Sequence, residues 1–238
     1  MSRVQFTRFS QLDAEGVNRD LQVHTVETDG TGTVAEYLKV AGDLQLGEIA
    51  FTDHIRRTSI YFPEFANHVR KEREKAPGIR VLFGFEAKAA DIDGTLDAPE
   101  AAIQQADIRL GSVHRFPGNR GGLVKADLFD YEEAAEIEYR LALGIVRFAP
   151  IDVLAHPGGM CLRAFGRFPD DKMLDLMRAT LDRGIAIEIN TSYTIDMDHF
   201  LELCAHVDPI VSVGSDAHKL SDLGNCRTAL RKRGIGCL

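Results

Sequence analysis

Seven short β-rich runs alternate with helical stretches along the whole chain, and this alternation constrains the fold more than any other feature. Strand–helix units in series, with no linker rich in Pro, Gly or Ser between them, predict a parallel sheet. The chain of 238 residues has a normal length for one α/β barrel, so we expect a single domain over 1–238. The expected strands cover 19–23, 48–52, 79–85, 107–113, 151–155, 185–189 and 210–214.

The segments between these runs have helical spacing. The first expected helix opens with a capping box at Thr33 and Glu36. Glycines at 144 and 184 are expected to end two later helices. Expected helices cover 33–45, 63–75, 127–143, 170–183, 197–205 and 222–233.

Most of the apolar runs end in a histidine or an acid. Asp216 and His218 are two residues apart after the last run, so an extended backbone would point both side chains into one pocket. A doubly wound sheet gathers ligands at one switch point, whereas a closed barrel brings every carboxyl strand end to one rim. The pattern therefore favours a TIM-like (β/α)7 barrel of about seven strands with a polar site at its mouth. The histidines that follow apolar runs are His24, His54, His114, His156 and His218.

These residue types indicate a metal centre. Imidazoles and carboxylates without thiolates select Zn²⁺, Mn²⁺ or Fe²⁺. The set exceeds what one ion can use, which favours two or three divalent ions that share a carboxylate over one structural zinc. Any one of these histidines alone could be an ordinary core or surface residue; His68, His199 and His206 lie on helical stretches and are expected to be structural or solvated. The candidate ligands are Gln22, His24, Asp29, His54, Glu86, His114, His156, Asp216 and His218.

Composition excludes several classes of protein. The net charge is −8, which argues against electrostatic binding of bulk nucleic acid. No apolar stretch approaches the roughly 20 residues of a membrane span, and the N-terminal residues lack the apolar segment of a secretory signal. The four cysteines have no CxxC spacing. We expect a cytoplasmic protein with structural thiols and no membrane association.

The order of the motifs resembles that of the polymerase-and-histidinol-phosphatase (PHP) family of metal-dependent phosphoesterases, from Asp20 to about Asn225. The resemblance implies a distorted seven-stranded barrel with two or three metal ions. It also implies that Glu86 bridges two of these ions. The matching motifs are Asp20-Leu21-Gln22-Val23-His24-Thr25 with Asp29-Gly30, Thr52-Asp53-His54, Gly84-Phe85-Glu86, Gly111-Ser112-Val113-His114, Ala155-His156-Pro157, Glu188-Ile189-Asn190 and Ser215-Asp216-Ala217-His218.

The resemblance also implies how the other ligands are shared. His24 and Asp216 would hold the first ion, and His114 and His156 the second. His54 and His218 would hold a third ion, helped by Asp29 or water. The family's first motif usually reads His-x-His, and here Gln22 stands in place of its first histidine. Because an amide oxygen is a weaker ligand than imidazole for zinc-like ions, the first ion's site is expected to be weaker.

Other residues are expected to support the ligands or bind substrate. Asp53, Glu188 and Asn190 could orient the metal ligands through hydrogen bonds, or could instead bond to backbone groups in turns and at strand ends. Arg57, Arg115 and Arg163 follow ligand-bearing strands, where a guanidinium could grip phosphate oxygens. The glycines at 118, 121 and 122 would allow a mobile lid, although they do not match a P-loop.

The expected reaction is hydrolysis of a phosphate monoester of a small metabolite by a metal-bound hydroxide. A nucleic-acid-end exonuclease or phosphodiesterase with the same metals is one alternative, and amidohydrolase-type C–N hydrolysis is another. A metal-binding protein with reduced activity is a third, supported only by Gln22. The residues expected to take part in catalysis are Glu86, Asp216, His218 and Arg115.

Overall fold

The computed structural model of the chain describes residues 4–117 and 123–237, so the glycines expected to allow a lid, at 118, 121 and 122, lie outside the described residues. The strands are β1 Thr7–Arg8, β2 Arg19–Val23, β3 Glu48–Phe51, β4 His54–Ile55, β5 Arg80–Lys88, β6 Ile108–Ser112, β7 Phe116–Pro117, β8 Leu123–Val124, β9 Val153–Leu154, β10 Ala186–Asn190 and β11 Ile210–Gly214. The α-helices are α1 Ala14–Val17, α2 Val34–Asp43, α3 Phe62–Arg73, α4 Glu100–Gln105, α5 Tyr131–Phe148, α6 Gly159–Phe165, α7 Asp170–Arg183, α8 Met197–Val207 and α9 Asn225–Arg231.

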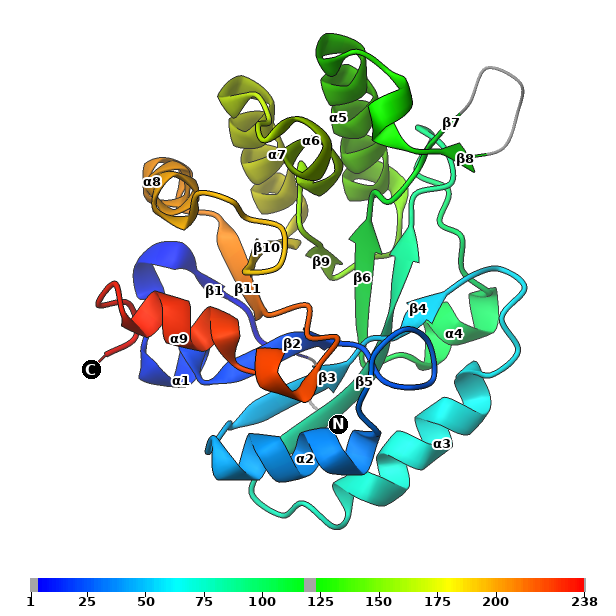
Figure 1. Cartoon of the computed structure of the whole chain (residues 1–238), viewed down its shortest axis with the longest axis vertical. Coiled ribbons are helices and arrows are strands. Elements are labelled where there is room, and N and C mark those ends of the chain that lie inside the picture. Colours follow the sequence, from blue (N-terminus) through cyan, green and yellow to red (C-terminus); the bar gives the residue numbers. More distant parts are fainter. Residues whose placement is uncertain (1–3, 118–122, 238) are drawn as a thin grey trace.

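Seven parallel strands form the predicted barrel, with helices arranged around its outside (Figure 1). They follow the order β2-β3-β5-β6-β9-β10-β11, which is also their order along the chain. The ring closes only at the carboxyl ends of its first and last strands, where Val23 pairs with Ala217 and the amide of His24 donates to the Ala217 carbonyl at 2.9 Å. Near the start of β11, the short β1 pairs antiparallel with it instead. The barrel is therefore distorted, and its closure lies at the rim where the polar motifs are.

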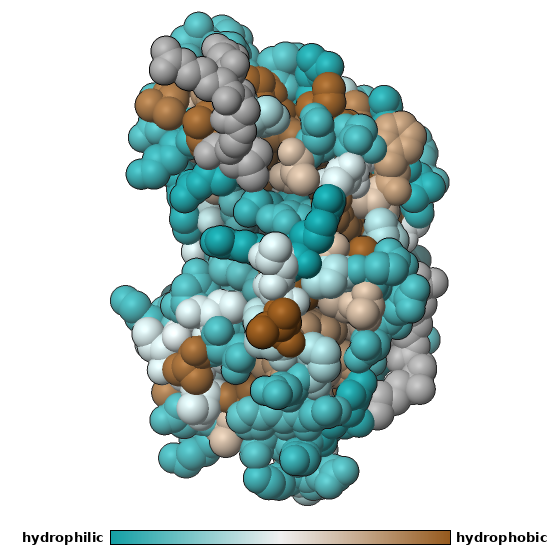
Figure 2. Space-filling model, turned by 90° about the vertical axis from the view of Figure 1, so that its right-hand side faces the viewer, coloured by the Kyte–Doolittle hydropathy of each residue, from teal (hydrophilic) through white to brown (hydrophobic). Residues whose placement is uncertain are grey.

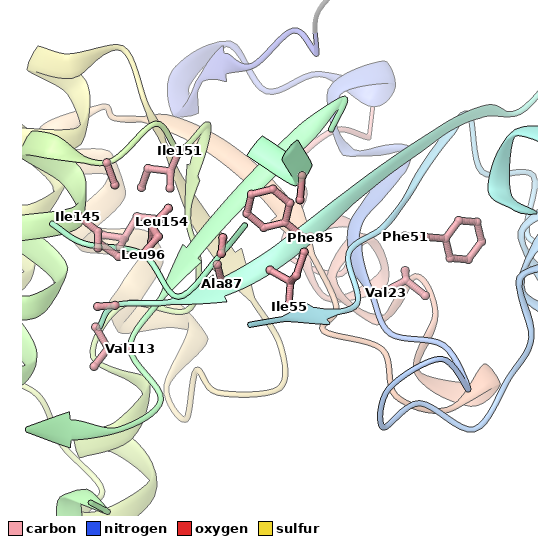
Figure 3. Close-up of a cluster of buried hydrophobic side chains, with 14 of the residues drawn as sticks. Val23, Phe51, Ile55, Phe85, Ala87, Leu96, Val113, Ile145, Ile151 and Leu154 are labelled. Atoms are coloured by element: carbon pink, nitrogen blue, oxygen red, sulfur yellow. The ribbon is translucent and has the colours of Figure 1, made fainter. Parts of the chain in front are cut away.

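Apolar side chains pack both inside and outside the ring. One buried cluster draws on six of the seven strands and contains no residue from a helix, so it fills the barrel interior. Its strand residues are Leu21, Ala50, Leu82, Ile108, Leu110, Val153 and Ala186. A larger cluster joins the outer faces of the strands to the helices. Figure 3 shows part of it: Ile55, Phe85 and Ala87 lie together on β4 and β5, and Ile145 of α5 lies beside Leu154.

Two helix boundaries confirm the sequence signals. Thr33 and Glu36 form the predicted capping box at the start of α2, because each side chain bonds the other's backbone amide. Gly184 ends α7 in the left-handed conformation, with φ of 66°. Both ends are encoded locally, within one turn of the helix they limit.

The prediction that Gly144 ends a helix is wrong, because α5 continues to Phe148. A Cβ at position 144 would lie 2.2 Å from the carbonyl oxygen of Ile92. The glycine therefore allows the loop at Ile92 to pass close to the middle of α5, and this contact between distant segments cannot be read from local sequence. The helix also begins later than expected, at Tyr131, after a short 3₁₀ turn at Ala126–Leu128.

The outer surface is mainly hydrophilic, with apolar side chains only in small scattered groups on the face in Figure 2. The large apolar side chains that are most exposed, Ile60, Leu128, Phe148 and Ile195, lie on different segments of the chain. Within the described residues, no helix combines the length and apolar character required to cross a membrane.

Candidate metal centre

The predicted ligands gather at the carboxyl ends of the barrel strands. His24 follows β2, His54 begins β4, Glu86 lies in β5, and His114 follows β6. His156 follows β9, and Asp216 and His218 follow β11. In a parallel barrel these strand ends share one rim. A chain of side-chain distances of 3.8 Å or less joins eight of the nine predicted ligands into one network: His24, Asp29, His54, Glu86, His114, His156, Asp216 and His218.

Glu86 lies at the centre of this network and is almost completely buried. Its Oε1 lies 2.7 Å from His156 Nε2 and 3.1 Å from His114 Nε2, and the two nitrogens are 3.2 Å apart. Ligands about 2.0–2.1 Å from a tetrahedral zinc ion lie about 3.3 Å from one another. The three donor atoms therefore converge: two of their separations are close to this spacing, and the hydrogen-bonded pair of Glu86 and His156 lies closer, at 2.7 Å.

The other oxygen of Glu86 faces different side chains. Its Oε2 lies 3.0 Å from His54 Nδ1 and 3.5 Å from His24 Nε2. The same nitrogen of His24 lies 3.1 Å from Asp216 Oδ1. His24 is fully buried, and within the described residues neither of its ring nitrogens nor Glu86 Oε2 has a hydrogen-bond partner. Buried polar atoms without partners are costly, so their convergence fits a bound cation.

A third group of ligands lies at the outer side of the centre. Asp29 is about half exposed, and its two oxygens lie 3.3 Å from His54 Nε2 and 3.4 Å from His218 Nε2. Although burial alone lowers the pKa of His54, Asp29 and Glu86 raise it to about 10. The bond to Asp29 raises the pKa of His218 to about 9. Hydrogen bonds from His218 and His54 lower the pKa of Asp29 below its usual range. The carboxylates that favour the protonated form of these imidazoles would also attract a cation bound between them.

The pKa of Glu86 reflects the same competition. Burial by itself raises the pKa of this carboxyl, but His114, His156 and His54 lower it well below its ordinary value. Glu86 is therefore an anion that already attracts positive charge on both of its oxygens.

Gln22 is the predicted ligand outside the network of eight. The Gln22 amide satisfies its neighbours when its nitrogen faces Glu188. In that orientation the nitrogen donates to both carboxylate oxygens of Glu188, at 2.6 and 2.7 Å. Only the amide oxygen then remains to face an ion. Glu188 is buried inside the barrel, and a Cβ at Gly214 would lie 2.0 Å from its Oε1, so the glycine makes room for this carboxyl group.

The three predicted supporting residues bond to backbone groups near the ligands. Glu188 accepts from the His156 amide at 2.9 Å, and burial raises its pKa to about 8. Asn190 accepts from the amides of Ser192 and Tyr193. Asp53 accepts from Thr25 and Thr28, so it fixes the loop that carries Asp29 and makes no hydrogen bond to an imidazole among the described residues.

Sequence reasoning missed two residues that hold the site. Asp20 accepts from the amides of Ser215 and Gly224, each at 2.8 Å, and so fixes the segment that carries Asp216 and His218. Tyr193 stacks on the His156 ring with centroids 4.1 Å apart. Asp20 lies in a quoted motif, but its partners are about 195 positions away and no local signal identifies them.

Backbone strain is also concentrated at the site. His156 has φ of 30° and Asp216 has φ of 52°, in the region that residues with a Cβ rarely adopt. Such conformations cost about 1–3 kcal/mol each and persist where the surroundings enforce them. Both residues are proposed ligands, so the fold holds them in place at some cost.

The network opens into a cavity of about 990 Å³. Arg115 and Arg163 line it, as predicted, and the Arg163 guanidinium lies over the Tyr193 ring, 3.6 Å from its centroid. Arg57 is not among the lining residues; its neighbour Arg56 is, and the amide of Arg57 bonds to Asp97. Lys88 and Lys125 also line the cavity and were not predicted.

Comparison with known proteins identifies the family that this chain resembles. The PHP domain model matches residues 20–192. A protein of Caldanaerobacter subterraneus subsp. tengcongensis named a probable phosphatase is 27% identical over 225 residues, which cover 89% of this chain and 80% of that protein. A second protein with that name, from Acetivibrio thermocellus, is 26% identical over 215 residues and covers 86% and 81%.

Solved structures show the same fold at low sequence identity. A Listeria monocytogenes protein with the provisional name of histidinol phosphatase superposes with a TM-score of 0.73 at 18% identity, covering 89% of this chain and 99% of the other. Histidinol phosphate phosphatase from Lactococcus lactis, solved with zinc, L-histidinol and phosphate, gives a TM-score of 0.70 at 20% identity and covers 91% and 94%. These structures confirm the predicted barrel.

Proposed function

The chain belongs to the PHP domain family, and from that membership we propose that it hydrolyses a phosphate monoester of a small metabolite at a centre of two or three metal ions. Metal-dependent hydrolysis of a phosphoester follows from the family itself. The network around Glu86 supports a centre of two or three ions.

One observation carries the proposal: eight imidazole and carboxylate side chains from separate strand ends share one connected network with unpartnered buried atoms. Glu86 Oε1, His114 and His156 would hold one ion. Glu86 Oε2, His24 and Asp216 would hold another, with the amide oxygen of Gln22 as a weak additional ligand. His54, His218 and Asp29 would hold a third. The donor set suits Zn²⁺, Mn²⁺ or Fe²⁺.

Such ions, when bound, supply an activated water and positive charge that offsets the phosphoryl oxygens. The side chains of the chain itself position the substrate. Arg115 follows His114 in sequence, and Arg163 lies over the ring that stacks on His156, so these two cavity-lining arginines are the candidates for binding a phosphate at the Glu86 Oε1 site. Both can donate paired N–H groups to phosphate oxygens.

His218 can supply a proton to the leaving oxygen when only two ions are bound. Its Nδ1 faces the backbone carbonyl of Asp216 at 2.9 Å, and its Nε2 faces Asp29 and the cavity. Asp29 favours the protonated form of this ring. With a third ion at this position, His218 would be a ligand and could not act as the acid.

The proposal is tested with protein that has been stripped of metal and reloaded separately with Zn²⁺, Mn²⁺ or Fe²⁺. Sugar, nucleotide and amino-alcohol phosphates are offered, and inorganic phosphate is measured. We expect release that depends on the added metal. Cleavage of single-stranded DNA without release from any monoester would favour the exonuclease alternative. Tight metal binding without turnover of any substrate would favour a binding protein.

A further inference from the structure

The walls of the cavity are more basic than the chain as a whole. The net charge of the protein is −8, yet five basic side chains line this cavity: Arg56, Lys88, Arg115, Lys125 and Arg163. Apart from the proposed ligands, the acidic side chains that line it are Asp127 and Asp222. Arg115 and Arg163 are already proposed to bind the reacting phosphate. The remaining basic residues therefore need another explanation.

Two of these residues lie next to each other on one wall. Strands β4 and β5 are parallel neighbours in which His54 pairs with Glu86 and Ile55 with Ala87. The residues that follow are Arg56 and Lys88. Because side chains alternate along a strand, Lys88, the last residue of β5, lies on the same side as Glu86 and about 7 Å further along. Arg56 directly follows β4, two positions beyond His54. Both residues line the cavity, which confirms that side.

Among the residues that the structure describes, the pair carries more positive charge than its carboxylate partner offsets. Lys88 is largely buried, and its Nζ lies 2.9 Å from Asp97, which also accepts from the Arg57 amide. Lys88 is thus held in position. The Arg56 amide donates to Ser59, but its guanidinium has no carboxylate partner in the part of the chain that the structure describes. Two cations against one carboxylate leave one net positive charge facing the cavity.

From this arrangement we propose that Arg56 and Lys88 form a subsite for a second anionic group of the substrate, either a carboxylate or another phosphate. The inference rests on the proposed phosphatase function and names the class of substrate: small phosphate monoesters with a further anion about 7 Å from the reacting phosphate. A guanidinium next to an ammonium group binds either anion through charge-assisted hydrogen bonds. Monoesters with a cationic amine in that position are disfavoured.

The test compares four substrates of similar size on metal-loaded enzyme: glycerol 3-phosphate, 3-phosphoglycerate, glycerol 1,3-bisphosphate and phosphoethanolamine. We expect a KM for one or both substrates with a second anion that is about tenfold lower than for glycerol 3-phosphate. The difference between 3-phosphoglycerate and the bisphosphate then identifies the anion. Phosphoethanolamine is expected to have the highest KM.

Arg56→Gln should remove this preference. Its KM for the favoured substrate rises about tenfold, while kcat and the KM for glycerol 3-phosphate stay close to those of the wild type. Lys71→Gln is the matched control, because it removes one positive charge from an exposed position on α3 that does not line the cavity. Its KM values should not change. Equal KM values for all four substrates in the wild type, or equal shifts in both variants, would overturn the subsite and leave the proposed function intact.

Failure of the proposed function has a different signature, which is the absence of phosphate release from all four compounds. In that case calorimetric titration of the metal-loaded protein with glycerol 1,3-bisphosphate and 3-phosphoglycerate still tests the subsite. Binding that Arg56→Gln weakens about tenfold and Lys71→Gln leaves unchanged supports it. Affinity that is the same in both variants contradicts it.

Discussion

The two oxygens of Glu86 face two unlike halves of the same centre. On the Oε1 side, two imidazole nitrogens lie 2.7 and 3.1 Å away and complete a set of three donors. On the Oε2 side, the nearest nitrogens lie at 3.0 and 3.5 Å, and Gln22 stands where the family usually has an imidazole. We propose that this carboxylate joins a site with two imidazole ligands to a site with one imidazole, Asp216 and the weaker amide oxygen of Gln22.

The supporting hydrogen bonds follow the same division. On the Oε1 side, Glu188 fixes the His156 backbone and Tyr193 stacks on its ring. On the Oε2 side, Glu188 accepts hydrogen bonds from the amide nitrogen of Gln22. Only the neutral amide oxygen of Gln22 is then available to bind an ion. Glu188 therefore supports the proposed ligand His156 on the Oε1 side and restricts the proposed ligand Gln22 on the Oε2 side. We expect the Oε1 half to bind its ion more tightly.

The largest effect is expected from removing what both halves share. Glu86→Ala removes the carboxylate that two of the proposed ion sites share, so both sites lose a ligand; metal loading should be lost and turnover should fall about a thousandfold or more. Metal content and phosphate release measure the two effects. His68→Ala, at an exposed position on α3, should change neither. Equal effects of the two substitutions would contradict the role of Glu86.

The halves should separate in a metal titration of single ligand variants. His114→Ala removes an Oε1 ligand, and we expect the tighter binding phase to weaken by about 100-fold or more, since even partners of ligands contribute 10–100-fold. His24→Ala should lower the affinity of the weaker binding phase and leave the affinity of the tighter phase unchanged. Loss of the same phase in both variants would mean that the centre does not divide at Glu86.

Gln22→His should make the weak half resemble the strong one. The new imidazole can donate one ring N–H to Glu188 and offer the other nitrogen to the ion. Affinity in the weaker phase should rise about tenfold or more, with the tighter phase unchanged. Mass spectrometry of metal content after dialysis measures the gain. If the variant retains no more metal than the wild type, the amide is not what limits this half.

The smallest effect concerns the outer ligands in metal-free protein. Asp29 raises the pKa of His218 from 6.5 to about 9, so the stabilisation is complete below pH 6.5 and disappears as pH rises through about 9. Because Asp29 is half exposed, solvent reduces the contribution to about 1 kcal/mol or less. Urea unfolding at pH 6 and pH 10 measures it. Asp29→Asn should remove most of the difference in unfolding free energy between pH 6 and pH 10. If this variant keeps the full difference, Asp29 does not stabilise protonated His218.

The strands and most ligands could be predicted because their signals are local. An apolar run followed by a histidine identifies a strand end, and parallel strands bring such ends to one rim. Thr33, Glu36 and Gly184 likewise mark helix ends through contacts within one turn.

Features that depend on distant contacts could not be predicted. Gly144 was misread because its constraint is the carbonyl of Ile92, on another segment. The choice between Arg56 and Arg57 depends on which side of β4 faces the cavity, and that short strand was not predicted. The hydrogen bond of Gln22 to Glu188 joins residues more than 160 positions apart, so the sequence indicated a weaker ligand without showing what restrains it.

Anomalous diffraction from crystals grown with Zn²⁺ shows whether separate strand ends share ions through Glu86. We expect a strong peak within about 2.3 Å of Glu86 Oε1, His114 Nε2 and His156 Nε2, and a weaker one beside Glu86 Oε2. Crystals with saturating zinc and no peak within bonding distance of Glu86 would contradict this sharing of ions.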